Sequence, residues 1–118
     1  MSLHIGSWSI NANGFEGELK VTAIDAQGNL SGTGFDNEIL GFWDETSQKI
    51  TFMRLEDPSN PSTFQIYTGY QFSNPLPDQD GLIHTLAGSF EGFKGTGGTA
   101  QRSVIGWFAR VTVPSVLK

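Results

Sequence analysis

Residues 62–73 read Ser-Thr-Phe-Gln-Ile-Tyr-Thr-Gly-Tyr-Gln-Phe-Ser, and this stretch decides the fold class. From Phe64 to Phe72 every second position is aromatic, aliphatic or threonine, and the positions between them hold Gln65, Tyr67, Gly69 and Gln71. A period of two sends successive side chains to opposite faces of an extended strand, whereas a helix repeats about every 3.6 residues. The stretch is therefore predicted to be a strand, the longest of the chain.

Seven further segments show the same period and are also predicted to be strands: 5–11, 16–25, 30–36, 38–43, 48–56, 82–93 and 103–113. Turn-forming Gly, Asn, Asp and Pro residues stand between them, and Asn13-Gly14 supplies the positive φ angles of a tight hairpin. Gly95-Thr96-Gly97-Gly98 is not a phosphate-binding loop, because a strand rather than a helix follows it. We expect a hairpin connection there, and almost no helix anywhere.

A chain of 118 residues is too short for two cores, so we expect a single domain over residues 1–118. Eight strands joined by short loops leave no room for long crossovers, and closing the sheet removes two exposed edges. The prediction is an all-β protein, an eight-stranded antiparallel up-and-down β-barrel. A two-sheet sandwich with Greek-key connections is the alternative.

Composition excludes several classes of function. With 7 basic and 12 acidic residues the net charge is −5, and no basic stripe is available for nucleic acid or an anionic membrane. The absence of cysteine rules out disulfides, thiolate metal sites and a thiol nucleophile. No apolar run is long enough to cross a membrane, and Met1-Ser2-Leu3 does not resemble a signal peptide. We expect a soluble protein, cytoplasmic if this N-terminus is the native one.

Gly6-Ser7-Trp8 near the start and Arg110 near the end resemble the G-x-W and terminal cation of the calycin β-barrels. In that superfamily the Trp closes one end of the barrel and the cation lies across its ring, so the resemblance implies an Arg110–Trp8 stack. Within the superfamily the chain is most similar to avidin and streptavidin. The similarity rests on the G-x-W and on four further stretches, at 21–23, 28–33, 67–70 and 104–111.

The biotin-binding residues of the avidins are not all present. Asn11 or Asn13 could replace their first-strand Asn, but Phe35 stands where their Tyr is expected, and a phenyl ring donates no hydrogen bond. Their last-strand Asp has no counterpart, since Trp107 follows Gly106. Each unpaired amide group of buried biotin would cost about 1–3 kcal/mol, so we predict weak or no biotin affinity.

Isolated polar residues give little sign of catalysis. His4 and His84 have no partners at metal-ligand or triad spacing, which favours surface or interface histidines, and we predict neither a metal site nor a cofactor. Arg54 differs from the other charged residues, because it shares a face with Ile50 and Phe52. If that face points inward, Arg54 would anchor a carboxylate; if outward, it is a surface charge.

Several predicted strands carry apolar residues on both faces, and one interior cannot take both sets. Examples are Leu40 and Phe42 beside Ile39 and Trp43, and Ile105 and Trp107 beside Phe108. Either the outer set packs against another copy of the chain or loops cover it, and we expect the first, a homo-oligomer.

Together these observations favour a non-enzymatic barrel that binds a small molecule at the end opposite Trp8. The predicted ligand-binding residues are Asn11, Phe35, Phe42, Tyr67, Tyr70 and Phe90. The alternative is a structural or protein-interaction module with a filled interior, acting through its homo-oligomeric interface. An enzyme is disfavoured, because the sequence offers no recognisable nucleophile–base pair.

Overall fold

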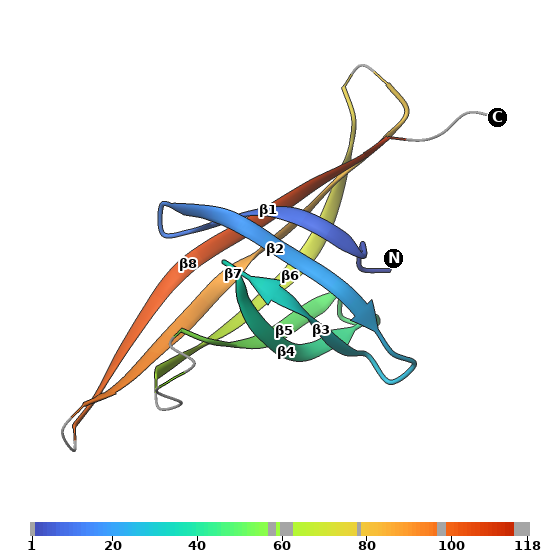
Figure 1. Cartoon of the computed structure of the whole chain (residues 1–118). Coiled ribbons are helices and arrows are strands. Elements are labelled where there is room, and N and C mark those ends of the chain that lie inside the picture. Colours follow the sequence, from blue (N-terminus) through green and yellow to red (C-terminus); the bar gives the residue numbers. More distant parts are fainter. Residues whose placement is uncertain (1, 57–58, 60–62, 78, 97–98, 115–118) are drawn as a thin grey trace.

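A computed structural model of the chain describes residues 2–56, 59, 63–77, 79–96 and 99–114. Eight β-strands and no helix make up this part (Figure 1). The strands are β1 (Gly6–Ala12), β2 (Phe15–Ile24), β3 (Asn29–Gly34), β4 (Asn37–Asp44), β5 (Lys49–Leu55), β6 (Thr63–Pro75), β7 (Gly81–Thr96) and β8 (Thr99–Pro114). The prediction of eight strands is confirmed, although β7 and β8 are longer than their sequence patterns indicated.

Each strand pairs antiparallel with the next, and β8 returns to pair with β1, so the sheet is a closed barrel. The closing register places Ser9 opposite Arg110 and Ala12 opposite Trp107. The predicted up-and-down barrel is therefore confirmed, and the sandwich is not the fold. The described residues include no helix capable of spanning a membrane.

The connections alternate between the two ends of the barrel. The β1–β2 turn holds Asn13 and Gly14 at φ angles of 52° and 91°, as the Asn-Gly pair requires. This turn and the β3–β4 turn at Phe35-Asp36 lie at one end, which we call the mouth. Gly97 and Gly98 of the expected β7–β8 hairpin lie outside the described residues. The opposite end, which we call the closed end, is covered by the N-terminal segment, whose Leu3 is buried.

Aromatic side chains fill the centre of the barrel. Phe52, Tyr67 and Phe90 form a stack in which successive ring centroids are 4.6 Å apart. Trp107 meets Phe52 and Tyr67 edge-on at 5.9 and 5.6 Å, and its indole N–H donates to two backbone carbonyls. Gly69 leaves room for this indole, because a Cβ there would lie 2.8 Å from the ring. Such aromatic pairs contribute about 0.5–1.5 kcal/mol each beyond their buried area.

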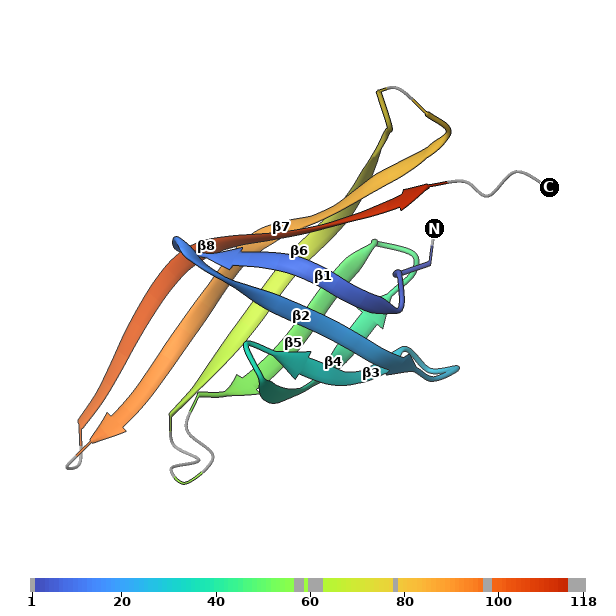
Figure 2. The same ribbon diagram turned by 45° about the horizontal axis from the view of Figure 1, so that its top comes forward.

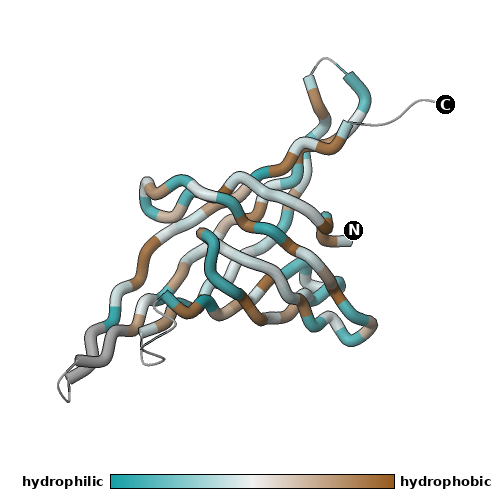
Figure 3. The backbone as a smooth tube through the Cα atoms, viewed as in Figure 1, coloured by the Kyte–Doolittle hydropathy of each residue, from teal (hydrophilic) through white to brown (hydrophobic). Residues whose placement is uncertain are grey.

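Aliphatic side chains and the other two tryptophans complete the core, as the period of two predicted. Hydrophobic and hydrophilic residues alternate along much of the backbone (Figure 3). The remaining buried apolar residues are Leu3, Trp8, Ile10, Ala12, Leu19, Val21, Leu30, Ile39, Trp43, Ile50, Leu86 and Ala109.

The three longest strands, β6, β7 and β8, project beyond the rest of the barrel (Figure 2). β5 pairs with β6 only as far as Tyr70, and β1 pairs with β8 only between Trp107 and Arg110. The molecule is consequently elongated, with extents of 59 × 31 × 24 Å.

The expected stack of Arg110 on Trp8 is wrong. Arg110 pairs with Ser9, the neighbour of Trp8, so the two side chains leave opposite faces of the wall. Trp8 is buried inside, whereas Arg110 is exposed and its guanidinium carbon lies 5.3 Å from the centre of the Phe108 ring. The indole N–H of Trp8 donates instead to the backbone carbonyl of His4.

Candidate functional site

A cavity of about 530 Å³ opens at the mouth, at the opposite end of the barrel from Trp8. The aromatic stack forms its floor through Tyr67 and Phe90, with Ala12 and Ile105 beside them. The rest of its lining comes from Asn13, Phe15, Phe35, Arg54, Glu56, Gln65, Gly92, Phe93, Arg102 and Ser103. An apolar floor with a few polar groups on the walls is typical of small-molecule sites.

Three polar side chains on β5 and β6 are linked on the wall of this cavity. Arg54 donates through Nη1 to Oε1 of Gln65 at 3.0 Å, and the Tyr67 hydroxyl donates to the same oxygen at 2.9 Å. Burial raises the pKa of Tyr67 to about 12, with a smaller opposing effect from the Arg54 charge. The hydroxyl therefore keeps its proton at neutral pH. Arg54 faces the cavity, which settles the orientation that the sequence left open.

Phe35 lies at the rim, where Arg54 contacts it and where Gly17, which has no side chain, leaves room for its ring. The backbone of Phe35 has a φ of 49°, which is costly for a bulky side chain. Arg54 donates through Nε to the carbonyl of Gly34 at 2.7 Å and through Nη2 to that of Phe35 at 3.4 Å. Its guanidinium also lies over the Phe35 ring, 5.3 Å from the centroid. A Cβ on Gly17 would lie 2.4 Å from this ring, so only glycine leaves it in place.

The structure brings together three of the six residues predicted to bind a ligand. Phe35, Tyr67 and Phe90 all line the mouth cavity. Asn11, Phe42 and Tyr70 do not, because the strand register turns them to the outer face. Phe42 and Tyr70 are 62% and 54% exposed, and Asn11 accepts a hydrogen bond from the backbone of Gly14. Gln65 also lines the cavity but was not among the predicted residues. It stands two positions before Tyr67 and therefore shares its face of the strand, which was the available signal.

The expectation of a surface histidine is wrong for His84. His84 is only 8% exposed, and its Nδ1 lies 2.6 Å from Oγ of Ser73. His4 and His84 both contact the Trp8 ring, with centroids 6.2 and 6.4 Å away. Burial lowers the pKa of His84, and the charge of His4 lowers it further.

This closed-end group brings a hydroxyl and an imidazole together without the other parts of a catalytic site. In the described part of the chain no carboxylate is bonded to His84 to orient its ring, as the third member of a triad would be. Among these residues there is also no cluster of three or more His, Cys, Asp or Glu side chains that could hold a metal ion.

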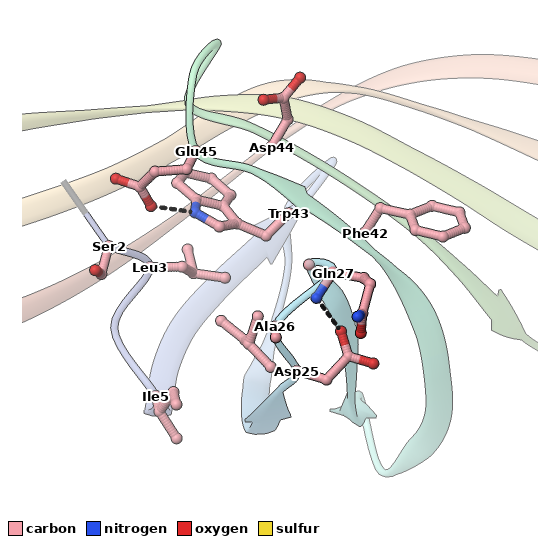
Figure 4. A pocket seen from close by; sticks show the side chains of 12 residues that line it. Ser2, Leu3, Ile5, Asp25, Ala26, Gln27, Phe42, Trp43, Asp44 and Glu45 are labelled. Atoms are coloured by element: carbon pink, nitrogen blue, oxygen red, sulfur yellow. Dashed lines mark hydrogen bonds between the residues drawn. The ribbon is translucent and has the colours of Figure 1, made fainter.

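A second hollow, about 630 Å³ in volume, lies beside the closed end (Figure 4). The N-terminal segment, the β2–β3 turn and the end of β4 surround it. Its carboxylates already stabilise local structure: Asp25 accepts from the backbone of Gln27, and Glu45 accepts from the indole of Trp43 at 2.8 Å. Phe42 points away from Trp43 there. We take the mouth cavity as the candidate site, because it lies above an aromatic floor inside the barrel, whereas this hollow lies beside the closed end.

None of the comparisons with family models, curated proteins and solved structures gave a significant match.

Proposed function

We propose that the protein is a non-enzymatic binding barrel that holds a small, largely apolar molecule in the mouth cavity. One observation carries this proposal. The aromatic stack fills the centre of the barrel, yet about 530 Å³ stays open above it, within the 300–1,000 Å³ range of ligand sites. A barrel whose only task was mechanical would gain stability from filling this space as well. We further propose that this binding barrel is of the avidin-like type.

The test is a titration with N-phenylnaphthylamine, a neutral dye that fluoresces in apolar surroundings. Ile105 lines the cavity, so Ile105→Trp should fill it and weaken the dye binding. Thr112 lies on the same strand, is exposed and is absent from the lining, so Thr112→Trp is the matched control. We expect saturable binding to the wild type and to the Thr112 variant. Equal binding by all three proteins, or none by the wild type, would contradict the proposal.

A second candidate function, self-assembly, is favoured by a set of exposed apolar side chains that we call the outer apolar surface: Leu40, Phe42, Met53, Tyr70, Phe72, Val104 and Phe108. The barrel register brings some of its members together. Leu40 pairs with Met53, and Ala87 pairs with both Tyr70 and Phe108. Exposed apolar side chains gathered in this way are typical of protein interfaces. We infer that other copies of the chain cover this surface.

Native mass spectrometry tests this second candidate. The wild type should be a dimer or a larger homo-oligomer. A variant carrying both Tyr70→Glu and Phe108→Glu should be monomeric, because it buries two charges in the interface. The matched control is Lys20→Glu, an exposed charge on β2 outside the outer apolar surface. A wild type that stays monomeric at high concentration would refute self-assembly and leave the binding proposal intact.

A further inference from the structure

Arg54 is a partly buried cation without a carboxylate partner among the described residues. A guanidinium carries five N–H groups, and the three hydrogen bonds of Arg54 go to two backbone carbonyls and one amide oxygen. Two N–H groups therefore remain on a side chain that lines the mouth cavity. The ion pair at this end joins Arg102 to Glu91 and does not involve Arg54. A positive charge in this position favours an anion from outside the chain.

The amide of Gln65 adds a further donor next to Arg54. Its Oε1 accepts from both Arg54 and Tyr67, and this double acceptance fixes which end of the amide carries the oxygen. The NH₂ group is then the end left for another partner, and in the described structure it has none. Arg54 and Gln65 thus present N–H groups on one wall of the cavity.

The guanidinium is fixed in orientation before any ligand arrives. The Gly34 and Phe35 carbonyls hold one edge, and the Phe35 ring covers one face. The positive φ of Phe35 and the absence of a side chain on Gly17 allow the Phe35 ring to take this position. A preorganised guanidinium loses little entropy on binding, and its planar fork matches a carboxylate.

We propose that the mouth cavity takes an aromatic monocarboxylate, whose carboxylate accepts N–H groups of Arg54 and Gln65 while its apolar body lies against Phe90 and Ile105. This inference rests on the proposed binding function and names its ligand class. Four phenylalanines line the cavity, namely Phe15, Phe35, Phe90 and Phe93, so a ring stacks better there than an alkyl chain. Glu56 also lines it and opposes a carboxylate, but it is exposed, so solvent weakens the repulsion.

The experiment compares naphthoate with naphthylmethanol, a neutral molecule of nearly the same shape, by calorimetric titration. The wild type should bind naphthoate about tenfold or more tightly than the alcohol, as a charge-assisted contact predicts. Added salt should weaken only the naphthoate complex. Arg54→Gln should weaken naphthoate binding more than alcohol binding and so remove the preference. Glu56→Gln, on the same rim, is the matched control and should strengthen naphthoate binding.

The outcomes separate the two proposals. Equal affinities of the wild type for both compounds, without a salt effect, overturn the carboxylate site but leave the binding barrel standing. An Arg54→Gln variant that keeps the full preference also overturns the site. If neither compound binds, the carboxylate proposal fails, and the dye titration then decides the binding function separately. Because the two wild-type titrations need no variant, a failure of Arg54→Gln to fold does not rescue the proposal.

Discussion

The imidazole of His84 lies against the indole of Trp8 and accepts or donates a hydrogen bond at Ser73, in the buried closed end of the barrel. Burial and the nearby His4 lower the pKa of His84 below its usual 6.5. The unfolded chain therefore binds a proton at a higher pH than the folded one, and protonation favours unfolding.

We accordingly expect the free energy of unfolding to be constant from pH 8 to about 7 with respect to this group, and to fall as the pH drops below about 6.5. Urea denaturation at a series of pH values measures the effect. In the His84→Asn variant this fall in the free energy of unfolding at low pH should be absent. An unchanged pH dependence in that variant would show that another group is responsible.

Gly17→Ala should destabilise the protein and weaken binding at the mouth. The added Cβ would lie 2.4 Å from the Phe35 ring, which must then shift from its present place beside Arg54. Overpacking of this kind costs about 1–3 kcal/mol. Gly106→Ala is the matched control, since a Cβ there lies 3.8 Å from its nearest neighbour. Equal melting temperatures for the two variants would be inconsistent with this account.

Tyr67 should retain its proton well beyond the usual pKa of 10. In a Tyr70→Phe protein Tyr67 is the sole tyrosine, so the ultraviolet absorbance of tyrosinate reports it alone. We expect a midpoint displaced towards 12. Since ionisation is easier in the unfolded chain, stability should decline as the pH rises from 10 towards 12. A midpoint at 10 in the folded protein would argue against the buried position.

Removing the Tyr67 hydroxyl tests the polar group more directly. Tyr67→Phe keeps the stack with Phe52 and Phe90 but loses the hydrogen bond to Gln65. A loss of about 0.5–1.5 kcal/mol in unfolding free energy is expected. A neutral substitution would mean that water replaces the hydroxyl at no cost.

Biotin should bind weakly or not at all. Phe35 lines the cavity, and the proposed avidin-like resemblance puts it in place of a tyrosine of that family, so it would offer no hydroxyl to the ureido oxygen. Isothermal titration with biotin is the direct measurement, and submicromolar affinity would contradict the prediction. If the avidin alignment holds, Phe35→Tyr should increase the affinity.

The sequence was sufficient to predict the strands and their closure, because alternation and turn residues are local signals. Asn13-Gly14 specifies its hairpin almost alone. The register at which β1 meets β8 is not local, and it decides which face a residue occupies. Because Arg110 lies opposite Ser9 and not opposite Trp8, its side chain is on the other face of the barrel wall from the Trp8 ring.

The site was only half predictable for the same reason. Along β6 the aromatic Tyr70 and Phe72 are exposed, whereas Gln65 and Gln71 point inward. Hydropathy alone would assign these faces the other way round. The proximity of Ser73 and His84 likewise depends on the β6–β7 register, for which a single sequence contains no signal.

The stack of Phe52, Tyr67 and Phe90 fills the centre of the barrel and separates the mouth cavity from the closed end. If the mouth cavity binds a ligand as proposed, that ligand meets Tyr67 and Phe90 at the floor and enters and leaves through the mouth. Because Phe35 lines this cavity, a change in its side chain should alter the association rate and the dissociation rate together.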